Sequence, residues 1–124
     1  MISTAPFRAL LLGTDTAGTY AGVTAIGSSR PIDASSYSLL TFYLTSIGVT
    51  SGGTVIIEEA DWDPAIDMPY SGTWGALQTI SASTFTGGAT LPVKISPNCY
   101  GFVRVRVSAT ITGGGSVVAT LRMV

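Results

Sequence analysis

The sequence predicts an all-β fold, an antiparallel β-sandwich or jelly roll of about eight strands in a single domain, residues 1–124. Short apolar stretches recur at intervals of roughly eight to fifteen residues with turn residues between them, and no spacing is typical of βαβ units. Lys, Glu and Gln, which normally build exposed helix faces, number only four in 124 residues, so we expect almost no helix. Residues 100–124 supply the third observation, a long apolar and polar alternation.

This alternating segment contains two arms separated by three glycines at residues 113–115. Odd-numbered residues are apolar in both arms, and the even-numbered positions include Arg104, Arg106 and Arg122. A three-residue glycine loop would pair odd residues with odd and even with even, so that both apolar faces coincide. The pattern therefore predicts a β-hairpin.

The predicted register places Arg106 directly opposite Arg122. Like charges in that position destabilise a sheet by roughly 0.2–1 kcal/mol. We therefore expect a carboxylate or a partner molecule between them. Glu58 and Glu59 are adjacent in a strand and point to opposite faces, so they cannot act jointly on one bond. The expected roles are a solvated charge at the rim and a partner for an arginine on a neighbouring strand, such as Arg104 or Arg106.

The other elements follow in chain order. Strands are predicted at residues 7–12, weakly at 19–26, and at 37–45, 54–59, 74–80 and 90–95, with turns at 13–18, 27–31 and 81–89. The pair at 37–45 and 54–59 is predicted to form a second hairpin with a longer loop. Residues 1–6 are expected to form an extended arm that lies across a neighbouring subunit.

The long connection at residues 61–73 contains Asp61, Asp63 and Asp67. It fails the calcium-binding helix-loop-helix pattern, because Ile66 stands at the sixth position, where glycine is needed, and Gly72 at the twelfth, where glutamate is needed. An irregular calcium site that uses two of the aspartates remains an alternative to simple turn formation.

Aromatic residues gather in the same region. Trp62 and Tyr70 lie beside the aspartates, an arrangement that suits stacking on a sugar or anchoring an interface. Trp74 opens a predicted strand, and we assign its side chain to the core.

Composition excludes several classes of function. Charged residues make up 10 % of the chain, against roughly 25 % in ordinary soluble domains, and the net charge is -1, so neither nucleic acid nor membrane is an expected partner. The absence of histidine excludes Ser-His-Asp catalysis and ordinary zinc sites, and we expect no enzyme and no cofactor. No apolar run is long enough for a leader, so synthesis is expected in the cytoplasm. So few charges favour a surface covered in a homo-oligomer or larger assembly, with hydration by Ser, Thr and Gly as the alternative.

Residues 70–74 and 104–116 resemble the small β-structured virion proteins of tailed bacteriophages, and size and composition are most similar to head decoration (cement) proteins. The resemblance implies a protein on the capsid exterior that assembles as dimers or trimers and clamps neighbouring major capsid subunits. A tail, baseplate or fibre component and a carbohydrate-binding module are the alternatives. The candidate partner-binding residues are Trp62, Tyr70, Arg104, Arg106 and Arg122.

Overall fold

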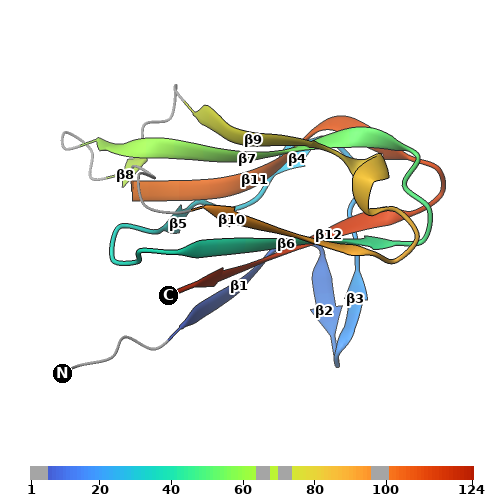
Figure 1. Cartoon of the computed structure of the whole chain (residues 1–124), viewed down its shortest axis with the longest axis horizontal. Coiled ribbons are helices and arrows are strands. Elements are labelled where there is room, and N and C mark those ends of the chain that lie inside the picture. Colours follow the sequence, from blue (N-terminus) through green and yellow to red (C-terminus); the bar gives the residue numbers. More distant parts are fainter. Residues whose placement is uncertain (1–5, 64–67, 70–73, 96–100) are drawn as a thin grey trace.

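The computed structural model describes residues 6–63, 68–69, 74–95 and 101–124, with the backbone alone for 61–63 and 68–69. Two antiparallel sheets face each other as layers (Figure 1). The first, here called the β12 sheet, has the strand order β1 (Phe7–Leu12), β12 (Ser116–Met123), β6 (Leu40–Ile47) and β10 (Thr90–Ile95). In the second, here called the β11 sheet, β11 (Gly101–Thr112) lies between β7 (Gly52–Asp63) and the short strands β4 (Gly27–Ser28) and β5 (Ile32–Asp33). On its other side β7 pairs with β8 (Met68–Pro69) and β9 (Gly75–Ser81), and the predicted all-β sandwich is confirmed.

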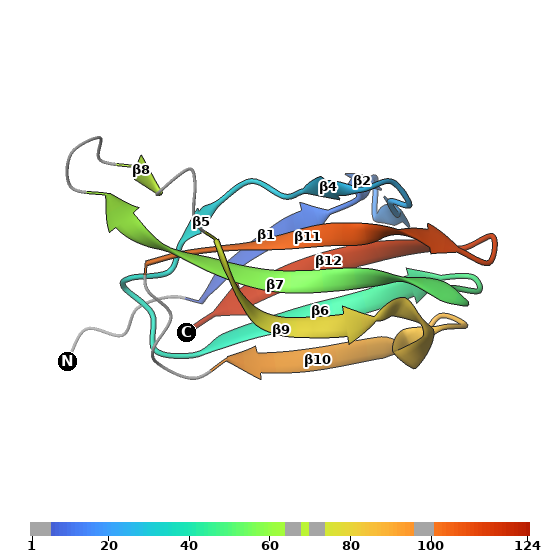
Figure 2. The same cartoon turned by 90° about the horizontal axis from the view of Figure 1, so that it is seen from above.

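Successive strands repeatedly cross from one sheet to the other. The connections from β6 to β7, from β9 to β10, from β10 to β11 and from β11 to β12 all change layer, and the first strand lies beside the last. Figure 2 shows the two layers from above. This order is compatible with the predicted jelly roll. Of the twelve strands in the described part of the chain, seven have six or more residues. The predicted number of about eight is therefore close to the number of long strands, and the short strands were not predicted.

The prediction of a hairpin at residues 100–124 is wrong. Both arms are strands and both alternate as expected, but β11 pairs with β7 while β12 pairs with β1 and β6. The loop at residues 113–115 is an arch that joins the two sheets. Alternation identifies which face of each arm is apolar. That face is buried equally well whether the two arms pair within one sheet or face each other from opposite sheets. The predicted second hairpin is wrong for the same reason, because β6 and β7 also belong to different sheets.

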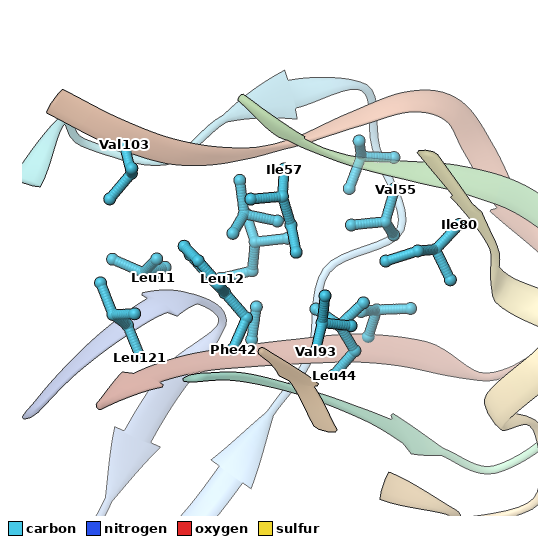
Figure 3. Close-up of a cluster of buried hydrophobic side chains, with 14 of the residues drawn as sticks. Leu11, Leu12, Phe42, Leu44, Val55, Ile57, Ile80, Val93, Val103 and Leu121 are labelled. Atoms are coloured by element: carbon cyan, nitrogen blue, oxygen red, sulfur yellow. The ribbon is translucent and has the colours of Figure 1, made fainter. Parts of the chain in front are cut away.

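The apolar faces of the two sheets meet in one core (Figure 3). Val103 and Val105 from β11 are fully buried, as are Phe42 and Leu44 from β6. Burying a side chain of this size stabilises the fold by about 1.5–3 kcal/mol. A 3-10 helix, η1 (Ala82–Phe85), interrupts the polar segment predicted as a turn, and it contributes the buried ring of Phe85 to the same core.

A small hairpin, β2 (Thr14–Thr16) and β3 (Thr19–Ala21), projects away from the β12 sheet (Figure 1). Ala17 and Gly18 form its turn with φ of 52° and 85°, and two positive values match the twist of antiparallel strands. The Asp15 carboxylate accepts a hydrogen bond from the Gly18 amide at 3.0 Å. Sequence analysis assigned residues 13–18 to a turn and missed this hairpin, because Ala-Gly lacks the usual Asn-Gly or Asp-Gly signal.

No helix in the described part of the chain is long and apolar enough to cross a membrane.

Candidate functional site

Glu58 joins two arginines on the outer face of the β11 sheet. Its side chain is 6 % exposed although it points away from the core, and it lies opposite Arg104 in the register of β7 and β11. Arg104 and Arg106 each donate from Nε to Glu58 Oε1 at 3.0 Å, and Nη2 of Arg106 donates to Oε2 at 3.2 Å. The predicted pairing of a β7 glutamate with these arginines is confirmed.

Opposing effects set the pKa of Glu58. Burial alone raises the pKa of the carboxyl group, because it disfavours the charged form. Hydrogen bonds from Arg106 and Arg104, together with their positive charges, outweigh this effect and hold the pKa below its ordinary value. Glu58 is therefore ionised at neutral pH, and the cluster carries one net positive charge.

Trp74 covers this cluster from the segment that leads into β9. The Arg104 guanidinium lies 4.1 Å from the centroid of the Trp74 ring, a cation–π distance. Trp74 is half-buried and does not belong to the core cluster, so its assignment to the core is wrong. The sequence shows an aromatic residue at the start of a strand, but it does not show that an arginine two strands away in the sheet lies against the ring.

The second polar site is a pocket on the outer face of the β12 sheet, with a volume of about 580 Å³. It is lined by residues of β1, β12 and β6 and by Tyr20 from the projecting hairpin. Arg8 and Arg122 are direct cross-strand partners, and Thr120 and Tyr43 form the neighbouring pair. The pocket therefore presents two guanidinium groups and three hydroxyl groups.

Arg122 has no partner for its Nε within the described residues, although that atom is buried. A buried donor without an acceptor costs about 1–3 kcal/mol, and more when it is charged. The predicted juxtaposition of Arg122 with Arg106 is wrong, because the two residues lie in different sheets. The direct cross-strand partner of Arg122 is instead Arg8, a like-charge pair that was not predicted.

The remaining predicted site residues lie at the ends of the described segments or outside them. Trp62 lies at the end of β7, paired with Pro69, and its side chain is outside the described part; Tyr70 lies outside the described residues altogether. The sugar-stacking hypothesis for these two residues therefore stays a prediction. Asp61 and Asp63 belong to β7 rather than to a loop, and Asp67 lies outside the described residues. Within the described residues, no three Asp, Glu, His or Cys side chains lie together as metal ligands would.

Sequence reasoning missed four polar residues of this pocket, Arg8, Tyr20, Tyr43 and Thr120. Arg8 falls within the predicted first strand, but Leu10 and Leu12 share its parity, so this strand does not alternate and its sequence does not indicate which way Arg8 points. The position of Arg8 beside β12 could not be predicted either, because the first strand has no local signal for a partner more than a hundred residues away.

The strand edges of the two sheets differ in their protection. β10 contains Pro92 and the exposed Lys94, which discourage pairing with another chain, and β4 and β5 have two residues each. β9 has seven residues, GALQTIS, with neither charge nor proline. Among the described strands it pairs only with β7. β1, the other edge strand of the β12 sheet, contains Arg8, so β9 is the one long edge strand in the described part of the chain without a charge or a proline.

The fold is similar to that of a solved structure described as SPBc2 prophage-derived protein YomS, with a TM-score of 0.54 and 10 % sequence identity. The similarity covers 100 % of this chain and 99 % of that one, so it extends over the whole sandwich. No family model matches this sequence. No curated protein sequence matches it either.

Proposed function

We propose that this protein is a non-enzymatic structural component of a tailed-phage virion that decorates the capsid exterior and binds the major capsid protein. The solved structure with a similar fold is a prophage-derived protein, and the similarity extends over the full length of both chains. This origin agrees with the resemblance of residues 70–74 and 104–116 to phage virion proteins. A chain with 10 % charged residues also suits a protein whose surface is covered in an assembly.

The unprotected β9 edge is the observation that carries the assembly part of this proposal. Its outer backbone groups have no strand neighbour among the described residues, and Ala76, Gln78 and Thr79 are exposed along it. An extended segment that adds to such an edge gains backbone hydrogen bonds without rearranging the sandwich. We propose that a strand of a neighbouring subunit, from the capsid protein or a second copy, pairs here.

A charge placed on this edge tests the mechanism. Thr79→Lys introduces a lysine at an exposed position of β9, where it opposes strand addition. Thr110→Lys is the matched control, because it adds the same charge at an exposed position of β11, away from the β9 edge. Both variants are compared with the wild type by co-sedimentation with empty capsids of the encoding phage and by thermal unfolding.

The wild type and Thr110→Lys are expected to bind at a fixed ratio per capsid subunit, and Thr79→Lys to lose binding without a change in melting temperature. Equal binding by all three proteins contradicts the edge mechanism but leaves decoration intact. Binding of the wild type to purified tails rather than to capsids overturns decoration and makes the protein a tail, baseplate or fibre component.

A further inference from the structure

We propose that the pocket on the outer face of the β12 sheet binds the carboxylates of an acidic segment of a partner protein. The polar residues of its lining are Arg8, Arg122, Tyr20, Tyr43 and Thr120, and the apolar ones are Ala9, Leu10 and Leu121. It lies on the sheet opposite the β9 edge, so the inference stands apart from the proposed function.

Neither arginine of the pocket has an ion-pair partner among the described residues. Arg104 and Arg106, by contrast, pair with Glu58 on the outer face of the other sheet. Arg8 and Arg122 face each other directly across β1 and β12, where like charges repel. An anion that binds both guanidinium groups removes this repulsion.

The buried Nε of Arg122 adds a donor that the described chain does not use. A guanidinium group presents its donors in a planar fork that matches a carboxylate, and such charge-assisted hydrogen bonds are stronger than neutral ones. The hydroxyl groups of Tyr20, Tyr43 and Thr120 supply further donors around the same space. The pocket is therefore equipped for a carboxylate.

The positive charge also continues beyond the pocket along one cross-strand row. Arg122 pairs with Thr41 on β6, and Thr41 pairs with the exposed Lys94 on β10. Strands in a sheet are about 4.8 Å apart, so the row from Arg8 to Lys94 spans about 14 Å. An extended segment of four or five residues covers that length, whereas a single anion in the pocket does not reach Lys94. The row therefore favours a segment with several acidic side chains.

Titration with a defined peptide tests the proposal. The probe is an end-blocked hexapeptide of alternating glutamate and glycine, compared with the same peptide carrying glutamine, and binding is followed by NMR of the isotopically labelled protein. The glutamate peptide is expected to shift the Nε signals of Arg8 and Arg122 and to bind more weakly as salt is added. The glutamine peptide is expected to leave these signals unchanged.

Two arginine variants locate the binding. Arg122→Gln should weaken binding of the glutamate peptide roughly tenfold or more, because it removes hydrogen bonds between charged groups. Arg30→Gln removes the same charge from an exposed position between β4 and β5, and should leave the affinity unchanged. The amide fingerprint spectrum of each variant confirms that it is folded.

Three results overturn the proposal. The first is an absence of saturable binding at millimolar peptide concentrations. The second is equal weakening by Arg122→Gln and Arg30→Gln, which would mean that only the overall charge matters. The third is tighter binding of a glucuronic-acid disaccharide than of the glutamate peptide, which would identify an acidic sugar rather than a protein segment as the ligand.

Discussion

Glu58→Gln is expected to destabilise the fold at neutral pH by about 2 kcal/mol. The carboxylate accepts three hydrogen bonds at 3.0, 3.0 and 3.2 Å from two arginines that would otherwise repel each other. Hydrogen bonds to charged groups contribute about 1.5–3 kcal/mol each. Arg104 and Arg106 are 21 % and 33 % exposed, so solvent screens part of this energy. Both Nε–H groups donate to Oε1, so a glutamine oxygen at that position retains two hydrogen bonds without the negative charge, and the bond to Oε2 is lost.

The pH dependence distinguishes the ion cluster from simple packing. Because the pKa of Glu58 is lower in the folded protein than in the unfolded chain, its carboxylate stabilises the fold above the unfolded-state pKa, near 4.5. This contribution is lost as the pH falls through the folded-state pKa. The difference in unfolding free energy between the wild type and Glu58→Gln should therefore shrink as the pH falls from 7 towards 3.

Urea unfolding at a series of pH values measures this difference, and a double-mutant cycle with Arg106→Gln isolates the pairwise term. We expect a coupling energy of about 1–2 kcal/mol at pH 7. Arg30→Gln, which removes an exposed cation elsewhere, is expected to change stability by less than about 0.5 kcal/mol. A destabilisation by Glu58→Gln that is the same at pH 3 and pH 7 would refute the reasoning.

Three further substitutions test other parts of the structure by urea unfolding. Arg122→Gln should stabilise the free protein by about 0.2–1 kcal/mol, since it removes a like-charge pair; a loss of stability would mean that Arg122 is paired internally. Gly115→Ala should cost more than Gly27→Ala, because a Cβ at residue 115 would lie 2.5 Å from a backbone oxygen, whereas a Cβ at residue 27 meets nothing within 4 Å; equal costs would contradict the arch. Thr50→Val should lower the free energy of unfolding by about 1–3 kcal/mol, because the buried Thr50 hydroxyl donates to a backbone carbonyl at 2.9 Å. Thr45→Val, at an exposed hydroxyl pair, should be nearly neutral, and similar losses for both variants would contradict this account of Thr50.

The sequence was sufficient for the long strands but not for the short ones or for the strand partners. Strands 7–12 and 90–95 were predicted with the bounds that they have, because an apolar segment and its flanking turn residues are local properties. The pairing of β11 with β12 was predicted wrongly, because an arch and a hairpin bury the same valines. Whether Gly113 and its neighbours close a hairpin or cross the sandwich depends on the competing partners β7 and β6.

For the candidate sites too, local features could be predicted from the sequence, whereas contacts between distant segments could not. The Glu58 cluster was foreseen because the charge of Glu58 and the alternation of Arg104 and Arg106 placed all three on polar faces of strands. The pocket of Arg8 and Arg122 was not foreseen, because it requires that the first and last long strands be neighbours and that the β2–β3 hairpin fold beside them. Such contacts between distant segments are set by the packing of the whole sandwich.

Co-sedimentation of the wild-type protein with empty capsids of the encoding phage tests the proposed function most directly. Saturable binding at a fixed ratio per major capsid subunit is the result that capsid decoration predicts. A protein that remains in the supernatant at concentrations well above that of the capsid subunits would contradict it.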